Sequence, residues 1–507
     1  MGKNNSELLF STERVSTEHV STDQSLKLYE QVIHYVIVRI DRGDWPADVK
    51  LPSVRSLAQE LGVHRLTVFR AYQELKQQGR IYVKDKSGYY AHASHATGLK
   101  KFAAYSECSS IQRGLYSESA HAADDPSVSA WRGMDGLTRV QSVNADFQFS
   151  KALIDPSLLP NRYWGELMVQ VFEKHPKVAA TYSSVQGDAE LRAAMAQHFS
   201  ADKHFALSTD EVLITSGAQQ AIDLISRSLI RTGDRVLIER PAYGPAMEIF
   251  RRQGARLTMT DIRPEGYDMD QIEWCMKTEK PRLFYMNPTF HNPTGFTVPD
   301  EQRKQLPELA ERYGCLIVED DSTYDISFGQ KPPSPIFAYD ISGSVVYIRS
   351  YSKYVAPGLR IAAVACRRQL MHSLLSVKAL VDNGSPLLNQ KLFLQYFQSP
   401  RMQQHIKKLC IALQIRKETM EDCLRDSGWT WTSPSGGLSL WLQLPSELKP
   451  NELLAKSIQE SISFVPGNVF DPVGAEGKTH IRLSYSYANE LQIQEGISRL
   501  LRISQSM

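Results

Sequence analysis

The sequence lacks long apolar runs. No stretch of the 507 residues approaches the roughly 20 consecutive apolar residues that a membrane-spanning helix needs. The N-terminal stretch MGKNNSELLFSTERVSTEH is too polar to resemble a secretory signal peptide. We therefore expect a soluble, cytoplasmic protein with no membrane partner.

Cysteine motifs are also missing. The six cysteines are scattered along the chain, and none forms a CxxC pair or a cluster with histidine. This spacing argues against a zinc site and against a disulfide framework. We expect no metal site, and reduced cysteines are consistent with a cytosolic protein.

A large excess of one charge is absent from the chain as a whole, whose formal net charge is only +2. The charge is nevertheless uneven. Residues 50–90 contain eight Lys or Arg but three Asp or Glu, a local excess of +5. Such a local excess indicates an anionic partner for this part of the chain.

The length predicts more than one domain, because a single hydrophobic core stops growing well below 507 residues. After a polar start, residues 23–92 are patterned as a small domain, and residues 146–507 alternate strand-like and helical runs, as in α/β folds. Residues 93–145 contain nine serines and are too long for an ordinary loop. We interpret them as a linker. The alternative is that Trp131 and Leu137 belong to a short helix docked on the large domain.

The small domain has the pattern of a winged helix-turn-helix. Three helices are expected in SLKLYEQVIHYVIVRIDRG, LPSVRSLAQELG and HRLTVFRAYQELKQQG, the second capped by Ser53. In the third helix we expect Val68, Phe69, Tyr72 and Leu75 to be buried. The stretch RIYVKDKSGYYAH then predicts a strand, a turn and a second strand, which form the wing.

Such a unit reads DNA with the start of its recognition helix, which enters the major groove. Here those residues are His64, Arg65 and Thr67. Basic side chains nearer the phosphates fix the register rather than read the sequence, and we expect this of Arg55, Arg70, Lys84 and Lys86. The alternative is a solvated basic face on a small helical domain, but the wing and the helix-turn-helix together favour DNA binding.

In the large domain, reactive or anion-binding residues follow successive strand-like runs. The run EVLIT leads into a helix whose start, Gly217, Ala218 and Gln219, offers free backbone N–H groups to an anion. The stretch VVYIRSYSKYVAPGLR supplies Ser350, Ser352, Lys353 and Arg360, and three other runs end near Tyr243, Asn292 and Asp320. Because ligands bind beyond the carboxyl ends of parallel strands, these residues should meet in one crevice.

This set of groups suits pyridoxal 5'-phosphate. The two serines, the arginine and the helix start suit a phosphate, and the Lys353 amine can form a Schiff base with the aldehyde. An acid at a strand end, Asp320 or Asp321, suits a ring nitrogen, Asn292 a ring hydroxyl and Tyr243 the aromatic face. Each motif alone is generic, because a lone lysine or a Gly-containing turn is usually a surface feature. Their occurrence after successive strands favours the cofactor.

Two resemblances cover most of the chain. Residues 23–92 resemble the GntR-type DNA-binding domain through LYEQV, LPSVRSLAQELGVHRLTVFRAYQELKQQG and KSGYY. Residues 146–507 resemble the fold-type I aminotransferases through TYSSVQGDAELR, TSGAQQAI, ERPAYG, HNPTG, VEDD, SYSKYVAPGLR and IRLSYS. A winged helix-turn-helix joined to an α/β aminotransferase-like domain resembles the MocR family of bacterial regulators.

The resemblance implies roles for single residues. Lys353 is implied as the Schiff-base lysine, with Asn292 at the ring oxygen and Tyr243 stacked on the ring. Tyr182 is implied to reach the phosphate in the other subunit, which predicts a homodimer with shared sites. Arg482 stands where the family binds a substrate α-carboxylate through its forked guanidinium.

The sequence departs from the family pattern at three places. The spacing from Asp320 to Tyr324 is four, where three is usual, so either Asp320 or Asp321 is the partner of the ring nitrogen, and strand alignment favours Asp320. The same insertion affects Tyr324, which is implied to lie near the ring oxygen. Ala152 replaces a usual glycine in the large domain. His64 replaces a usual serine in the GntR-like DNA-binding domain, which we call the DNA reader.

The expected function is transcription regulation by a dimeric protein that binds pyridoxal phosphate and operator DNA. Its effector is expected to be an amino acid, an amine or the cofactor itself. An active aminotransferase that carries a DNA-binding domain is the alternative, because Lys353 and Arg482 are retained. A scaffold without cofactor is a third interpretation. The sequence leaves open the effector, the operator, activation or repression, and any transamination.

Overall fold

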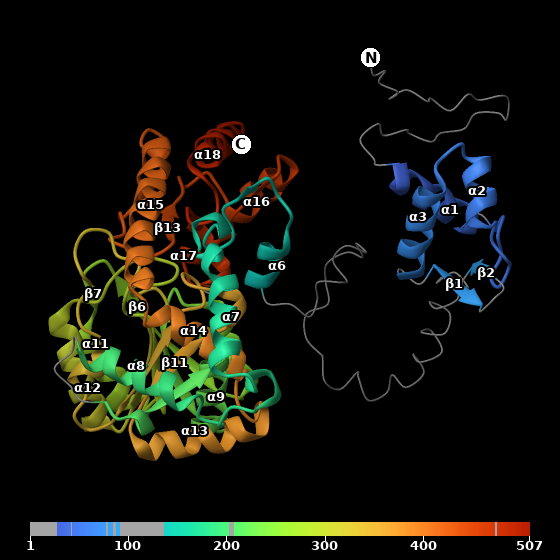
Figure 1. The fold of residues 1–507 in the computed structure, drawn as a ribbon. Coiled ribbons are helices and arrows are strands. Elements are labelled where there is room, and N and C mark those ends of the chain that lie inside the picture. The colour runs from blue at the N-terminus through green and yellow to red at the C-terminus, as the bar shows by residue number, and fades with distance from the viewer. Residues whose placement is uncertain are drawn as a thin grey trace, which may run out of the picture. The chain divides into compact units, whose positions relative to one another are not determined.

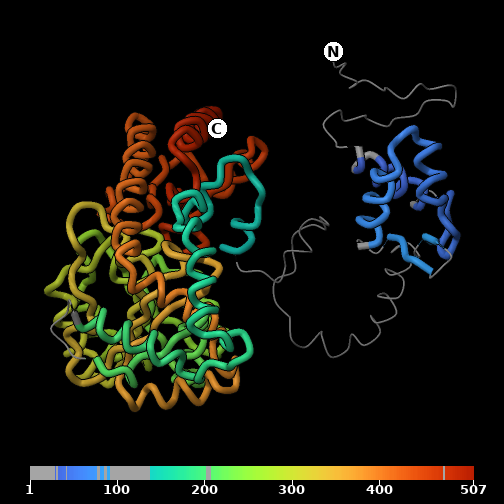
Figure 2. The backbone as a smooth tube through the Cα atoms, viewed as in Figure 1, coloured from blue at the N-terminus to red at the C-terminus, as the bar shows by residue number. Residues whose placement is uncertain are grey.

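The computed structural model describes residues 28–41, 43–77, 80–84, 88–91, 136–201, 207–471 and 474–507. These residues belong to two compact units, one within Met1–Ala123 and one within Asp124–Met507 (Figure 1, Figure 2). Most of the predicted linker, namely residues 93–135 of 93–145, lies outside the described residues.

The small unit is the winged helix-turn-helix that the sequence predicts. It consists of α1 (Leu28–Asp41), α2 (Val54–Glu60), α3 (Arg65–Gln77) and an antiparallel hairpin of β1 (Ile81–Lys84) and β2 (Gly88–Ala91). Ser53 caps α2 by accepting a backbone N–H from its first turn. Val68, Tyr72 and Leu75 are buried as expected, but Phe69 is 47% exposed. The prediction for Phe69 was wrong because this residue lies one position off the helix face that the other three share.

A mixed eight-stranded sheet forms the centre of the large unit, with strand order β4-β11-β10-β9-β8-β5-β6-β7. Strands β10, β9, β8, β5 and β6 run parallel, β11 is antiparallel to both of its neighbours, and β7 is antiparallel to β6. The strands are β4 (Val212–Thr215), β5 (Arg235–Arg240), β6 (Arg256–Arg263), β7 (Gly266–Tyr267), β8 (Leu283–Met286), β9 (Leu316–Asp320), β10 (Val345–Ser350) and β11 (Ala362–Ala365).

Helices cover both faces of this sheet. Along β10, Val345 and Tyr347 belong to one core, whereas Val346 and Ile348 belong to another, because successive side chains of a strand point to opposite faces. One face is covered by α9 (Ala218–Leu229), α10 (Gly244–Arg252) and α13 (Arg368–Val381). The other is covered by α7 (Trp164–Lys174), α8 (Ala189–Ala201), α11 (Met269–Thr278), α12 (Asp300–Tyr313) and α14 (Leu387–Phe397). Burial on both faces explains the nearly continuous apolar runs of these strands.

The C-terminal part adds an antiparallel sheet with its own core. Its strand order is β12 (Thr430–Trp431), β13 (Ser439–Gln443), β16 (His480–Ser484) and β15 (Val465–Pro466). Helices α15 (Pro400–Leu424), α16 (Pro450–Gln459) and α18 (Glu490–Gln505) gather at this end of the unit (Figure 1). The short α17 (Glu476–Thr479) precedes β16, and β3 (Phe147–Gln148) pairs with β14 (Ile462–Ser463).

The end of the predicted linker forms a helix, α6 (Gly136–Ser142). Leu137 is 5% exposed and packs with Trp441, Val465 and Phe470 of the C-terminal part. The alternative interpretation of a short docked helix predicts this position for Leu137, whereas Trp131 lies outside the described residues.

Two structural searches of the described ranges gave negative results. No helix there is long and apolar enough to cross a membrane. No group of three or more His, Cys, Asp or Glu side chains in those ranges is arranged to hold a metal ion.

Candidate functional site

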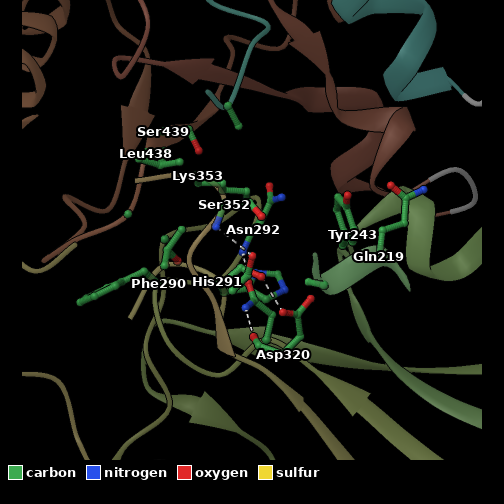
Figure 3. A pocket seen from close by; sticks show the side chains of 18 of the residues that line it. Gln219, Tyr243, Phe290, His291, Asn292, Asp320, Ser352, Lys353, Leu438 and Ser439 are labelled. Atoms are coloured by element: carbon green, nitrogen blue, oxygen red, sulfur yellow. Dashed lines mark hydrogen bonds between the residues drawn. The ribbon is translucent and has the colours of Figure 1, made fainter. Parts of the chain in front are cut away.

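A pocket lies where the carboxyl ends of the central parallel strands meet. Strands β8, β9 and β10 are neighbours in the sheet, so the residues that follow them lie at the same edge. Nine of the predicted site residues line this pocket: Ala218, Gln219, Tyr243, Asn292, Asp320, Ser350, Ser352, Lys353 and Arg360 (Figure 3). The fold therefore brings together groups that are far apart in the sequence.

Lys353 and Asp320 are the ionisable pair of the pocket. Asp320 ends β9 opposite Ile348 of the adjacent parallel strand β10, and Lys353 follows the end of β10. Burial lowers the pKa of the Lys353 amine below its ordinary value of 10.5, while the Asp320 carboxylate opposes this shift and the Arg482 cation adds to it. A lowered pKa increases the fraction of neutral, nucleophilic amine near neutral pH.

Asp320, rather than Asp321, faces the pocket. Its side chain accepts hydrogen bonds from the Tyr285 hydroxyl at 2.8 Å and the Ser322 hydroxyl at 2.6 Å. Burial raises the pKa of Asp320, although these hydrogen bonds and Lys353 act in the opposite direction. Asp321 is fully buried and lies 3.8 Å from the Arg349 guanidinium.

Arg482 stands behind Asn292. Its Nη1 donates to Asn292 Oδ1 at 2.9 Å, and its Nη2 donates to the backbone oxygen of Ser150 at 2.8 Å. The guanidinium lies 4.9 Å from the ring centroid of Phe470. Burial lowers the pKa of Arg482 to about 10, and its Nε has no hydrogen-bond partner among the described residues. An incompletely satisfied, buried cation of this kind suits an anionic ligand group.

The start of α9 is the part of the pocket that is predicted to bind an anion. Gly217 caps this helix with a φ of 89°, a conformation that favours glycine. A Cβ at Gly217 would collide with the Arg360 guanidinium, so the glycine allows that cation to approach the turn. Arg360 Nη2 donates to the backbone oxygen of Ser216 at 3.1 Å. With the buried Ser350 and Ser352 hydroxyls, these groups suit a phosphate.

Tyr324 and Tyr182 do not line the pocket. The Tyr324 ring lies under the Arg349 guanidinium, 4.2 Å from ring centroid to Cζ. The extra residue after Asp320 brings Thr323 to the pocket wall instead. Tyr182 is 86% exposed on the isolated chain. The structure therefore does not place Tyr324 at the pocket, whereas the role of Tyr182, which concerns the other subunit, stays a prediction.

Sequence reasoning missed part of the pocket wall. Asn287 Oδ1 accepts a hydrogen bond from the Asn292 backbone N–H at 2.7 Å, and Asn287 Nδ2 donates one to the backbone oxygen of Asp320. The Asn-Pro dipeptide at the end of β8 was a signal for Asn287. Leu438 and Ser439 had no such signal, because they come from the start of a distant antiparallel strand.

The opposite walls of the pocket differ in origin. Figure 3 shows Tyr243 and Gln219 on one side, and Phe290, Leu438 and Ser439 on the other. The first side belongs to the starts of α10 and α9, whereas Leu438 and Ser439 come from the C-terminal part. The pocket therefore lies between the central sheet and the C-terminal sheet.

The residues of the small unit that are predicted to read DNA lie at the start of α3. His64 and Arg65 are exposed, and Thr67 is partly buried. The His64 backbone oxygen accepts the Thr67 N–H at 2.9 Å, which closes the first turn. The exposed Arg65 side chain is thus presented by a rigid helix start.

The basic residues predicted to lie near phosphates are exposed where they are described. Arg55 is exposed on α2, and Lys84 is exposed at the end of β1. Arg70 is exposed on α3 with its guanidinium 4.1 Å from the Tyr29 ring centroid. Lys86 lies outside the described residues.

Two families match the chain. Residues 165–500 match the family of class I and II aminotransferases, and residues 28–90 match the gntR family of bacterial regulatory proteins. The chain is 29% identical to the uncharacterized HTH-type transcriptional regulator YdfD of Bacillus subtilis, over 94% of this chain and 96% of YdfD. It is 32% identical to aromatic-amino-acid aminotransferase 1 of Thermococcus litoralis, over 68% of this chain and 84% of that protein.

The large unit also resembles solved aminotransferases. One is LysN, the alpha-aminoadipate aminotransferase of Thermus thermophilus, complexed with N-(5'-phosphopyridoxyl)-L-leucine. The TM-score is 0.68 at 29% identity, and the match covers 76% of this chain and 97% of LysN. The match to YdfD covers 94% of the chain and therefore includes both units.

Proposed function

Because the chain belongs to the class I and II aminotransferase family and joins that fold to a GntR-family domain in the MocR-type architecture, we propose that it is a pyridoxal-phosphate-dependent transcriptional regulator. It binds operator DNA and senses an amino acid, an amine or the cofactor itself. The observation that carries the proposal is the presence in one chain of an exposed Arg65 on the recognition helix and Lys353 in the pocket. Full-length similarity to an HTH-type transcriptional regulator supports it.

The groups that line the pocket fit pyridoxal phosphate. Asp320 is available to a ring nitrogen, Asn292 to a ring oxygen and Tyr243 to the ring face. Arg360, the two serine hydroxyls and the start of α9 are available to the phosphate. When bound, the cofactor supplies an electrophilic aldehyde and an electron-withdrawing ring. The residues of the chain would hold this group, and burial lowers the pKa of the Lys353 amine.

We propose that Arg482 receives the carboxylate of an amino-acid effector. Its Nη atoms are engaged by Asn292 Oδ1 and Ser150 O, and its Nε has no partner among the described residues. A carboxylate that binds the guanidinium in a bidentate fashion must compete with at least one of these contacts. An amine without a carboxylate leaves both contacts in place. The two effector classes therefore differ in what they do to the residues around Arg482.

We also propose a homodimer in the cytoplasm, where operator DNA is found. Tyr182 is largely exposed on the single chain, so its ring is available to a partner subunit. Two readers in one assembly fit paired half-sites on DNA, which is the usual arrangement for helix-turn-helix proteins. The partner arrangement follows from the resemblance to aminotransferases.

The proposal is tested by cofactor trapping and DNA selection on the purified full-length protein. Borohydride reduction should fix pyridoxal phosphate to a peptide containing Lys353, and Lys353→Ala should leave no reducible attachment. Selection from random DNA should return paired half-sites. Absence of both the cofactor and a selected sequence would reject the proposal.

An active aminotransferase with a DNA-binding domain is the second candidate. The 32% identity to an aromatic-amino-acid aminotransferase and the retained Lys353 and Arg482 favour it. Steady-state assays with a panel of amino acids and 2-oxo acids separate the two functions. Repeated turnover at about 1 s⁻¹ or faster, the usual range for enzymes, would favour the enzyme. A single half-reaction without turnover would favour the regulator.

A further inference from the structure

A chain of hydrogen bonds runs behind the anion-binding start of α9. The Ser216 N–H donates to Gln220 Oε1 at 2.7 Å. The Ser216 carbonyl accepts from Arg360 Nη2 at 3.1 Å. Ser216 therefore connects the Gln220 amide to the Arg360 guanidinium. The position of the Ser216 backbone, and with it the contact to Arg360, depends on the orientation of Gln220.

Asp382 fixes that orientation. Gln220 Nε2 donates to Asp382 Oδ2 at 2.8 Å. An ionised carboxylate only accepts hydrogen bonds, so it must face the NH₂ end of the glutamine amide. The carbonyl end of Gln220 is then turned toward the Ser216 N–H. A residue 162 positions away in sequence thus sets the geometry of this turn.

Asp382 is itself anchored. The Lys378 ammonium lies 2.6 Å from both carboxylate oxygens, and the Gly384 N–H donates to Oδ1 at 2.9 Å. Burial acts to raise the pKa of Asp382, but hydrogen bonds from Lys378, Gly384 and Gln220 outweigh it and lower the pKa. Lys378 has no exposed surface. Asp382 is partly exposed, and ion pairs of this kind add little net stability, so we interpret this pair as one that orients Gln220.

We propose that Gln220 and Asp382 are positioning residues for the phosphate of the cofactor, an inference that rests on the proposed function. Gln220 holds the turn in which the N–H groups of α9 and the Arg360 guanidinium converge. Neither residue needs to touch the phosphate. Loss of either one should weaken phosphate binding and leave contacts to the ring unchanged.

The experiment compares pyridoxal phosphate with pyridoxal, which lacks the phosphate. Titration of the full-length apoprotein gives a Kd for each compound. Gln220→Leu removes both hydrogen bonds at similar size, so the Kd for pyridoxal phosphate should rise about 10-fold, or about 1.4 kcal/mol. The Kd for pyridoxal should stay constant. A purely structural role would raise both Kd values together.

A second part of the experiment exchanges the amide and the carboxylate between Gln220 and Asp382. Gln220→Glu places two carboxylates side by side and should weaken phosphate binding. Adding Asp382→Asn restores one acceptor and one donor and should recover most of the affinity. Ser228→Ala, on the same helix, is the matched control. An unchanged ratio of Kd values in Gln220→Leu, or no recovery in the double variant, overturns the inference. If the wild type binds neither compound, the proposed function fails as well.

A second and independent observation concerns α6, which is the first described helix of the large unit. Leu137 packs in a cluster with Trp441 and Phe470, and the pocket residue Tyr243 packs against the same cluster. The Phe470 ring in turn lies beside the Arg482 guanidinium. One side of α6 is therefore in apolar contact with residues around the ligand pocket.

A polar contact connects the same helix to Arg482. The Ser150 carbonyl accepts from Gln141 Nε2 of α6 at 3.2 Å and from Arg482 Nη2 at 2.8 Å. A carbonyl oxygen has two lone pairs, so it can serve both donors at once. If Arg482 turns toward a ligand, the oxygen is left to Gln141 alone.

We infer that α6 responds to the carboxylate of a bound ligand, and that this response is the route by which the pocket regulates the reader. The inference rests on the proposed function of Arg482. A ligand that engages Arg482 alters the contacts of Phe470 and Ser150, and both contact α6. A ligand shifts such an equilibrium only when it binds one arrangement better than the other.

Hydrogen exchange of the full-length protein tests this inference. The probes are pyridoxal phosphate and N-(5'-phosphopyridoxyl)-L-leucine. The second carries an amino acid with its carboxylate, and it has a secondary amine in place of the aldehyde, so it does not attach to Lys353. The adduct should change the exchange rate of amides 136–142 relative to the cofactor alone. Gln141→Leu should reduce that difference at least threefold, whereas the exposed Ser142→Ala on the same helix should retain it. Equal exchange with both probes, or an undiminished difference in Gln141→Leu, overturns the inference.

Discussion

At the scale of single residues, burial acts on Lys353 and Asp320 in opposite directions. It lowers the pKa of the amine and raises the pKa of the carboxyl. Each group is thereby less firmly held in its charged form than it would be in water. A pair in this condition can change its protonation when a ligand with its own charges enters. Perturbed ionisable groups of this kind are common at functional sites.

The lowered pKa of Lys353 predicts how cofactor attachment depends on pH. The neutral amine is the nucleophile, and its fraction rises with pH and levels off above the pKa. Because burial lowers that pKa from 10.5, the rate at which pyridoxal phosphate attaches to the apoprotein, followed by the change in its absorbance, should reach its maximum below pH 10.5. Lys353→Arg should show no attachment at any pH. A rate that still rises above pH 10.5 would contradict the expected shift.

Glu319 predicts a second pH effect, on stability. This fully buried carboxylate accepts the backbone N–H groups of Ile336 and Phe337 at 2.9 and 3.0 Å. Burial and the nearby Asp321 raise the pKa of Glu319 from 4.5 to about 7, against the effect of Arg303. The folded state then binds more protons than the unfolded state between these values. The free energy of unfolding should therefore fall as pH rises from 4.5 to 7.

Urea unfolding of wild type and Glu319→Gln at pH 5 and pH 7.5 measures the contribution of Glu319 to the pH dependence of the free energy of unfolding. The variant should lose less stability across that interval than wild type, because it has no proton to release. Its absolute stability should be lower by about 1–3 kcal/mol, since one acceptor oxygen is replaced by a donor. The exposed Glu308→Gln is the matched control on α12. Equal losses in wild type and Glu319→Gln would refute the assignment.

At the scale of elements, α2 and α3 predict different contributions to DNA binding. Arg65 begins the recognition helix, so Arg65→Ala should weaken the preferred operator by about 1–3 kcal/mol and relax base preference. Arg55 on α2 is expected to contact phosphate. Arg55→Ala should weaken specific and non-specific DNA alike and reduce the salt slope by about one.

Both variants are measured on an operator obtained by selection, across a salt series, with unrelated DNA as the comparison. The two arginines are exposed and the substitutions are identical, so the pair controls for loss of charge. Equal, sequence-blind losses would mean that α3 is not the recognition helix.

The elements and most of the pocket followed from local patterns in the sequence. Strands that are buried on both faces read as apolar runs, and a parallel sheet brings their carboxyl ends together. Lys353, Asp320 and Asn292 were therefore predictable neighbours. The same reasoning did not find Leu438 or Ser439, because contacts of an antiparallel strand in another sheet leave no local signal.

Inserted residues, and contacts between helices far apart in the sequence, limit how well residue spacing predicts the position of a side chain. One extra residue between Asp320 and Tyr324 turns the tyrosine ring toward Arg349 and leaves Thr323 at the pocket wall. The hydrogen bond from Gln220 to Asp382 spans 162 positions and two helices, so no motif contains both residues. Contacts of this kind depend on how α9 and α13 pack, which is a property of the whole fold.

At the scale of the whole molecule, regulation requires that the ligand pocket and the DNA reader influence each other. In α6, Leu137 and Gln141 contact residues around Arg482. Under the proposed function, an effector at Arg482 and operator DNA at α3 are two ligands of one protein. Their binding energies are linked through whichever arrangement of the chain each of them prefers.

The last prediction concerns the coupling between the ligand pocket and the DNA-binding site, which must be reciprocal. If N-(5'-phosphopyridoxyl)-L-leucine changes operator affinity by some factor, the operator must change affinity for that adduct by the same factor. We expect about 1–3 kcal/mol of coupling, roughly five- to 150-fold. Titration of the adduct into full-length protein, with and without an operator of two half-sites, measures it. Gln141→Leu should reduce both factors equally, while Ser142→Ala should keep them. If the adduct alters operator affinity but the operator leaves adduct affinity unchanged, the two effects do not arise from one equilibrium, and coupling through α6 is wrong.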